Sequence, residues 1–376
     1  MRRLIVGAML SASCAGGAVE STDVVRADSA GVRIVTSGAV DRELTWRFEE
    51  IGAFRDTLGA PWVFDELRPR AVVTDRAGRT YVLTNAPAIV RFGRDGRYER
   101  AVGRTGSAPG EMRAPRALVI QGDSLVVFDS QRGLVRWGPS LHAINDLPLV
   151  GALAEADEVV FRSGGAWVLR RTRSSDGTVV TLHGDTTAVP PLLSLLQPKE
   201  TILRGCQNLA IGLPPFFSSR ITWSTSKGVM LANVGPTYDL RLYEGPRLIA
   251  IVRRPLPPRR ATRDDLTRLH PEGYEFRLGP LVCTFTLQQL LDGPGLAAEF
   301  PQVHGLAILS DGTIWVKRSA GALPPVLDVF TADGAYAGTV RGIRLPLALL
   351  PNGELLVPRL DQETGGQHVV RMRVTR

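Results

Sequence analysis

A short polar turn followed by a run of apolar residues occurs six times along the chain. The runs include Tyr81-Val82-Leu83 and Ile314-Trp315-Val316, which are rich in β-forming residues. The glycines of the six turns are Gly78, Gly122, Gly165, Gly228, Gly312 and Gly353. Asp-Gly and Asn-Gly between apolar runs favour β-hairpins, because these turns need positive φ at their central residues. The pattern predicts an all-β repeat architecture, most simply a β-propeller.

A second apolar strand with its own hairpin turn follows several of these units. Ile89–Phe92 leads to Asp95-Gly96, and Leu327–Phe330 leads to Asp333-Gly334. Each unit therefore holds three or four antiparallel strands. Three of the five intervals between turn glycines span about 40 to 45 residues, which is the length of one four-stranded propeller blade.

The interval from Gly228 to Gly312 is long enough for a seventh blade or for an insertion. Segments 261–269 and 284–291 have patterns typical of short helices, the first with Thr262 as N-cap before two aspartates. The run 253–260 is rich in proline, which is poorly tolerated in a central strand. We therefore expect an all-β, six-bladed β-propeller with a short helical insertion, at about residues 255–300, between blades 4 and 5.

The first 18 residues have the features of an export leader. Arg2-Arg3 precedes the apolar stretch 4–10, and small residues precede Cys14. The apolar stretch is too short to cross a bilayer, which needs about 20 residues. Small residues before a cysteine resemble the bacterial lipoprotein signal, although Ser11 stands where that pattern prefers Leu, Val or Ile. We expect lipidation at Cys14, with plain secretion as the alternative.

Beyond the leader, we expect a tether over residues 19–31 and the propeller over residues 32–376. The tether segment is small and polar, whereas Val32–Val35 and Leu44–Phe48 alternate as strands do. A closed ring needs an early strand to complete the last blade. We expect one of these two segments to have that role.

The segment Gly103–Met112, followed by Ala114–Val119, resembles the connection between blades in NHL-type propellers. In that family, a glycine-rich loop leads through Gly-Glu and an apolar residue to a proline and the next inner strand. With Phe92–Gly96, the resemblance covers about one and a half blades. The chain is similar to exported bacterial six-bladed β-propeller proteins of the NHL/TolB-like group, many of which carry lipoprotein leaders. This resemblance implies the fold but no particular function, because propellers host binding platforms and enzymes alike.

The net charge of +8 comes almost entirely from arginine, since only three of the 45 basic residues are lysines. The arginines are scattered along the strands, whereas a nucleic-acid interface would cluster them on one element. We therefore expect no nucleic-acid partner. A denser group of arginines lies in the proline-rich segment: Arg253, Arg254, Arg259, Arg260, Arg263 and Arg268. We expect these arginines to face solvent, with contact to lipid headgroups or an acidic partner as the alternative.

Common catalytic and cofactor motifs are absent from the sequence. The glycine run 103–110 lacks a following Lys-Ser/Thr and leads to Pro115 rather than to a helix, so it does not match a phosphate-binding loop. No nucleophile elbow, Cys-x-x-Cys or His-Glu-x-x-His pattern occurs. We expect no cofactor, no metal and no catalytic residues. The alternative is a lactonase-like or lyase-like enzyme with an axial metal, for which the calcium ligands would be drawn from Asn85, Asn208, Asn233 and Asp129.

One constellation follows from the blade register. Counting back about eleven residues from the strand after each turn reaches the residue that opens the innermost strand of each blade. Four of these positions are basic: Arg70, Arg116, Arg220 and His304. They would ring one mouth of the central channel, where guanidinium groups suit carboxylate, sulfate or phosphate. The alternative is that they pair with acids of neighbouring blades or face solvent.

Two further cysteines remain if Cys14 is lipidated. Cys206 and Cys283 would then form a disulfide in an oxidising compartment, or stay as two buried free thiols. Taken together, the sequence predicts a monomeric binding or interaction platform in the cell envelope, as a periplasmic or outer-surface lipoprotein or else a secreted protein. Its partner would be an anionic ligand or an envelope protein, and its membrane contact would be the lipid on Cys14.

Overall fold

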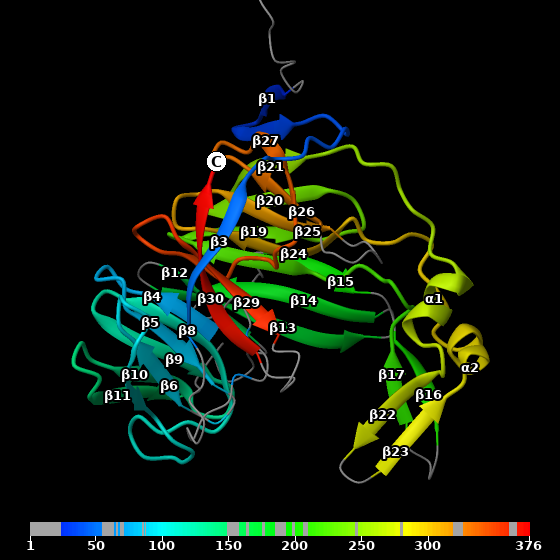
Figure 1. Ribbon diagram of the computed structural model, residues 1–376. Coiled ribbons are helices and arrows are strands. Elements are labelled where there is room, and N and C mark those ends of the chain that lie inside the picture. The colour runs from blue at the N-terminus through cyan, green and yellow to red at the C-terminus, as the bar shows by residue number, and fades with distance from the viewer. Residues whose placement is uncertain are drawn as a thin grey trace, which may run out of the picture.

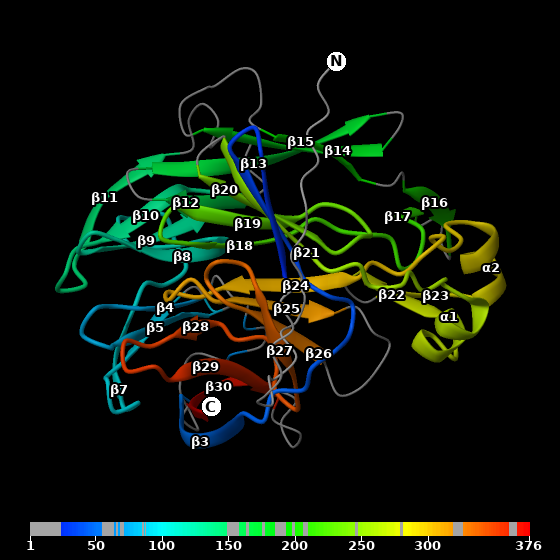
Figure 2. The same cartoon turned by 90° about the horizontal axis from the view of Figure 1, so that it is seen from above.

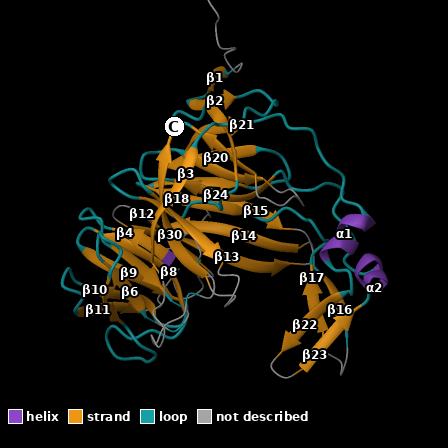
Figure 3. Cartoon of the chain, viewed as in Figure 1, coloured by secondary structure: helices purple, strands orange, loops and turns teal. Residues whose placement is uncertain are grey.

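The computed structural model describes residues 24–54, 64, 67, 71–84, 86, 88–148, 158–162, 165–174, 177–184, 193–197, 200–205, 210–244, 247–278, 281–318, 326–360 and 367–376. Within these ranges the regular structure is nearly all strand, with two short helices at one side (Figure 3). Neither of these helices is long and apolar enough to span a membrane. The leader, Cys14, Arg70, Asn85, Cys206 and Asn208 lie outside the described residues.

Five sheets have four antiparallel strands each, and we call these sheets blades. The first has β4 Val72–Thr74, β5 Thr80–Leu83, β6 Ile89–Phe92 and β7 Tyr98–Val102. The second has β8 Pro115–Gln121, β9 Ser124–Asp129, β10 Gly133–Trp137 and β11 Ala143–Pro148. The third has β12 Glu158–Arg162, β13 Gly165–Ser174, β14 Gly177–Gly184 and β15 Leu193–Gln197. The fourth has β24 Val303–Ile308, β25 Ile314–Arg318, β26 Val326–Phe330 and β27 Tyr336–Arg341. The last has β28 Ala348–Leu349, β29 Leu355–Leu360 and β30 Gln367–Thr375, together with β3 Arg47–Phe54 from the N-terminal part of the chain.

Another sheet has six strands rather than four. Its strands are β18 Thr222–Ser226, β19 Val229–Asn233, β20 Asp239–Glu244, β21 Arg247–Arg253, β2 Val32–Thr36 and β1 Val25–Ser29. The N-terminal hairpin β1–β2 widens it, because β2 pairs in parallel with β21. The protein is thus a β-propeller with five four-stranded blades, and the prediction of six is not met.

The described sheets are arranged as a ring. The inner strands contact one another in the order β28, β4, β8, β12, β18 and β24. Apolar side chains fill the spaces between neighbouring sheets. Phe92 packs with Leu356 between the last blade and the first, and Leu240 packs with Ile314 between the six-stranded sheet and the β24–β27 blade. The core is therefore divided into layers between sheets, as expected for a propeller.

An early strand completes the last blade, as predicted. β3 pairs with β30 from Arg47 to Phe54, so the second candidate segment contributes its last two residues, Arg47 and Phe48, and the strand continues to Phe54. The first candidate segment became β2. Residues 25–29, which we expected in a tether, form strand β1. All five are exposed, so this strand has no buried face that an alternation of apolar and polar residues would indicate.

The predicted hairpin turns have the expected backbone conformation. The glycines at five of the six turns have positive φ, between 59° and 87°: Gly78, Gly122, Gly228, Gly312 and Gly353. At the turn between β18 and β19, Lys227 also has positive φ, at 47°. The turn residues therefore match the requirement that made them predictive.

Four strands and both helices form a separate group at one side of the ring, which we call the side module (Figures 1 and 2). It contains β16 Thr201–Arg204, β17 Ala210–Leu213, α1 Arg263–Leu269, β22 Tyr274–Leu278, β23 Leu281–Phe285 and α2 Leu287–Asp292. It has its own core, which includes Ile211, Leu266 and Phe285. Thr262 is the N-cap of α1, as predicted, with a reciprocal bond from Asp265. The segment is not only helical, however, because the hairpin β22–β23 lies between the helices.

Candidate functional site

The structure places three of the four predicted channel residues at the start of inner strands. Arg116 and His304 are the second residues of β8 and β24, and Arg220 lies two residues before β18. Arg116 donates from Nε to Ser130 Oγ at 3.4 Å. Arg70, the fourth residue, lies outside the described residues. These three residues thus lie at or next to the start of an inner strand, whereas their place at a channel mouth stays a prediction.

His304 lies close to other basic groups. Although its side chain keeps contact with solvent, partial burial lowers the pKa of the imidazole, and Lys317 and Arg220 lower it further. The pKa of Lys317 is lowered as well, first by burial and then by Arg344. A like charge disfavours the protonated form of a base. In both cases a neighbouring basic group is the second cause of the lowered pKa, after burial.

Backbone packing explains why these groups meet. Lys317 on β25 stands beside Gly305 on β24 in the antiparallel register. A Cβ atom on Gly305 would lie 3.5 Å from Lys317 Cβ and 3.3 Å from Leu345 Cδ2. The segment before β28, which carries Arg344, therefore reaches the same point. We call Arg220, His304, Lys317 and Arg344 the basic cluster; among the residues that the structure describes, none of the four forms an ion pair with a carboxylate.

Lys317 and Arg344 were missed at the sequence level. Lys317 lies on a second strand, and the count considered only the start of inner strands. Arg344 could have been predicted, because the same count from Leu356, after the last turn, leads to its neighbour Leu345. The cluster gathers residues from three neighbouring sheets, which the sequence alone does not join.

The two described candidates for calcium ligands have structural roles. Asp129 is fully buried, and its carboxylate accepts four backbone N–H bonds from Arg113, Ala114, Gln131 and Arg132. Asn233 donates to the backbone oxygens of Thr237 and Asp239. Within the described part of the chain, no group of three potential metal ligands occurs.

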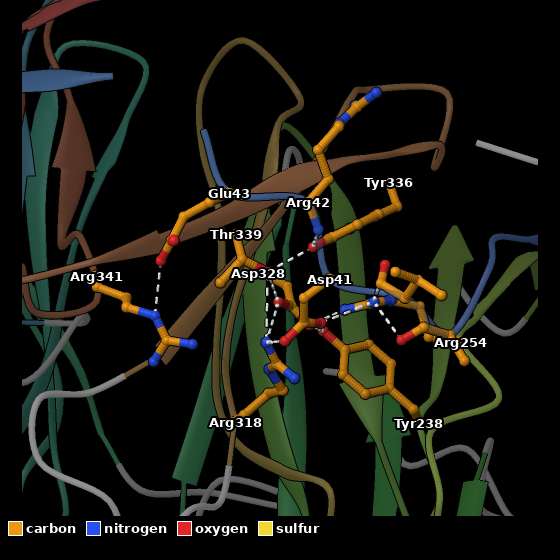
Figure 4. Close-up of polar contacts among 12 residues, drawn as sticks. Asp41, Arg42, Glu43, Tyr238, Arg254, Arg318, Asp328, Tyr336, Thr339 and Arg341 are labelled. Atoms are coloured by element: carbon orange, nitrogen blue, oxygen red, sulfur yellow. Dashed lines mark hydrogen bonds and ion pairs between the residues drawn. The ribbon is translucent and has the colours of Figure 1, made fainter. Parts of the chain in front are cut away.

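A second polar group is fully buried between the six-stranded sheet and the β24–β27 blade (Figure 4). Asp328 on β26 has no exposed surface and accepts from Tyr238 Oη and Arg254 Nη1, both at 2.8 Å, and from Thr339 Oγ1 at 2.7 Å. Arg318 Nη2 lies 3.3 Å from the same carboxylate. Burial and the adjacent Asp328 charge raise the pKa of Tyr238 well above its usual value. This tyrosine therefore stays protonated and donates.

Arg254 connects this network to the N-terminal segment. Its guanidinium group lies 3.8 Å from the centre of the Tyr336 ring and donates to the backbone oxygens of Gly38, Ala39 and Val40. It also bonds to Asp41, 3.0 Å away. Burial alone would raise the pKa of Asp41, but hydrogen bonds and charge from Arg318 and Arg254 lower it overall. These bonds hold residues 38–41 in place, whereas Arg318 Nε is buried without a hydrogen-bond partner among the described residues.

The arginines of the proline-rich segment mostly have acidic partners. Arg253 pairs with Asp239, and Arg259 and Arg268 both pair with Asp265 of the side module. The expectation of contact with lipid headgroups gains no support from these residues. This pairing contrasts with the basic cluster.

Comparison with known proteins supports the fold. No family model and no curated protein matches the sequence, so the NHL resemblance remains a prediction. Among solved structures, a candidate exported protein from Bacteroides fragilis NCTC 9343 matches with a TM-score of 0.52 and 9% identity, over 91% of this chain and 100% of that one. BamB from Moraxella catarrhalis matches with a TM-score of 0.31 and 10% identity, over 80% of this chain and 81% of that one. The glutaminyl cyclase of Myxococcus xanthus matches with a TM-score of 0.33 and 12% identity, over 87% of this chain and 96% of that one. Only the first of these matches has a TM-score above 0.5, and at 9% identity its likeness concerns the fold alone.

Proposed function

We propose that this protein is an exported propeller of the cell envelope that binds an anionic ligand at one mouth of its central channel. The export leader in the sequence supports the location. The basic cluster supports the ligand chemistry, because guanidinium and ammonium groups bind carboxylate, sulfate and phosphate through charge-assisted hydrogen bonds. The proposal describes a binding platform rather than an enzyme.

The observation that carries this proposal is the contrast in charge pairing. Arg220, Lys317 and Arg344 lie near His304 without an ion pair in the described structure, whereas arginines of the proline-rich segment pair with acids. Bringing like charges together is unfavourable, and the neighbouring basic groups add to the effect of burial in lowering the pKa values of His304 and Lys317. A bound anion would relieve this repulsion. The cluster is therefore better suited to receive negative charge than to stabilise the fold.

Sulfate is a suitable probe because its charge does not change near neutral pH. We expect isothermal titration calorimetry to detect sulfate binding and the double variant Arg220→Ala, Lys317→Met to weaken it by about tenfold or more, since a hydrogen bond to a charged group contributes about 1.5–3 kcal/mol. Arg268→Ala is the matched control, because this exposed arginine pairs with Asp265 in the side module. A wild-type protein that binds neither sulfate nor phosphate, or a double variant that binds like wild type, would contradict the proposal.

The pH dependence gives the same experiment a second arm. The pKa of His304 lies below its usual value of 6.5 in the free protein. An adjacent anion favours the protonated ring. At any pH at which His304 is neutral in the free protein, anion binding is therefore coupled to protonation of His304. Sulfate affinity should therefore rise as the pH falls from about 8 to about 5. His304→Asn should flatten this profile while leaving most of the affinity at high pH.

The finer features of the fold and of its location belong to the same proposal. We propose that the ring is an NHL-like propeller, in which the six-stranded sheet occupies the place between β12 and β24 without being a four-stranded blade. We also propose that Cys14 is lipidated and that the protein acts as a monomer. The mass of the mature N-terminal peptide and the sedimentation behaviour of the protein test these two points.

A further inference from the structure

A cavity of about 380 Å³ opens between the β24–β27 blade and the last blade. Its lining includes the turn residues Asp311 and Gly353, which follow the inner strands β24 and β28. His304 lies at the start of β24, whereas Asp311 follows its end. The cavity and the basic cluster are therefore at opposite ends of the same inner strand. A volume of this size suits one small molecule.

Two tryptophans form part of the wall. The rings of Trp46 and Trp315 have their centres 6.0 Å apart and are tilted by 59°. Trp315 is buried and fixed within the core between the blades, while Trp46 is half-buried. The guanidinium group of Arg376 lies 4.9 Å from the Trp46 ring. The wall therefore combines an aromatic surface with a guanidinium group that lies over the Trp46 ring.

The charged groups of the lining are balanced in sign. Asp311 and Glu354 are acidic, and Arg373 and Arg376 are basic. Glu354 is held by Arg371 at 2.6 Å, and Arg373 pairs with Glu49 at 3.2 Å. Asp311 uses Oδ1 for the backbone N–H and the hydroxyl of Thr313. The cavity thus offers both acceptors and donors, without the excess positive charge of the basic cluster.

We propose that this cavity binds a neutral sugar ring. Such a ligand has an apolar face that packs on an indole ring and hydroxyl groups that act as donor and acceptor at once. Carboxylates accept from these hydroxyls and guanidinium groups donate to them. Asp311 and Glu354 would repel a simple anion. Arg373 and Arg376 would repel a simple cation. The proposal does not depend on the anion site, because it concerns other residues at the opposite end of β24.

Saturation-transfer NMR with glucose and glucuronate tests this inference, because the two probes share one ring and differ in a carboxylate. We expect glucose to bind at the cavity, and Trp46→Ala to weaken glucose binding by about fivefold or more through loss of the aromatic face. Arg376→Ala is a second variant at an exposed side chain, which should weaken glucose binding without affecting folding. Trp46→Phe should retain part of the affinity.

The double variant Arg220→Ala, Lys317→Met separates this proposal from the proposed function. It should leave glucose binding unchanged while it weakens sulfate binding, and Trp46→Ala should do the reverse. Absence of saturation transfer to glucose in the wild-type protein would overturn the sugar site, whatever sulfate does. So would glucose binding that is the same in wild type, Trp46→Ala and Arg376→Ala.

Discussion

Arg253 and Arg254 are adjacent in the sequence but have different environments. The Arg254 side chain has no exposed surface and pairs with the fully buried Asp328, whereas the Arg253 side chain is 41% exposed and pairs with Asp239. A buried charge that loses its partner is costly, because it stays desolvated without compensation. An exposed pair contributes little, since water screens it. Local burial, rather than the arginine itself, decides the energetic role.

The substitution Arg254→Met should therefore destabilise the protein by about 3 kcal/mol or more. It removes the bonds to the backbone of residues 38–40 and leaves Asp328 with Arg318, at 3.3 Å, as its remaining cation. Arg253→Met is the matched control and should cost about 1 kcal/mol or less. Urea unfolding followed by circular dichroism measures both. Equal losses in the two variants would show that the network does not hold the N-terminal segment.

Among the elements, the N-terminal segment joins three sheets. β2 pairs with β21 of the six-stranded sheet, residues 42–44 bond to Thr339 of β27, and β3 completes the last blade with β30. At the middle contact, Leu44 N–H donates to Thr339 O at 2.9 Å, and Thr339 N–H donates to Arg42 O at 2.7 Å. The segment therefore acts as a strap across the ring. Its contact with β27 depends on a glycine at the facing position.

Gly338 permits this close approach. Its φ is +149°, and a Cβ atom there would lie 2.5 Å from Leu44 Cδ2 and 2.8 Å from Arg42 O. Gly338→Ala should separate the strap from β27, with a loss of stability of about 1–3 kcal/mol from backbone strain alone. Gly342→Ala is the control, because its φ is +82° but a Cβ atom would meet nothing within 4 Å. Hydrogen exchange should accelerate at the Leu44 and Thr339 amides in the first variant only; unchanged protection would refute the role of Gly338.

The sequence was informative where local chemistry decides the structure. The hairpin turns were predictable because glycine is needed at positive φ, and Thr262 was predictable as a helix cap. Tyr274–Leu278 alternates apolar and polar residues and could have been identified as a strand. We interpreted the insertion as helical because helical patterns lie on both sides of this segment. The pairing of β2 with β21 and the approach of Arg344 to Lys317 join residues of different sheets. Such contacts depend on the closed ring, and no local pattern encodes them.

On the scale of the whole molecule, the side module contains a disulfide-bonded cysteine. Cys283 on β23 is buried and disulfide-bonded. The predicted partner, Cys206, lies outside the described residues, but a Cβ atom on the preceding Gly205 would be 3.5 Å from Cys283 Sγ. A bridge between these cysteines would enclose β18 to β21, which belong to the ring. Oxidation would then stabilise the ring and the module together.

Loss of this bridge should lower the free energy of unfolding by about 4 kcal/mol, because the enclosed loop restricts the unfolded chain. Cys206→Ala and Cys283→Ala should have similar effects, and the double variant should lose no more than either single variant, since each one already removes the whole bridge. Reduction of the wild-type protein should lower its stability to that of the variants, whereas the double variant should not respond to reductant. A digest of unreduced protein should contain one peptide pair joined through Cys206 and Cys283. If both thiols are alkylated without reduction, or if the effects of the two single variants add, these cysteines do not form a bridge.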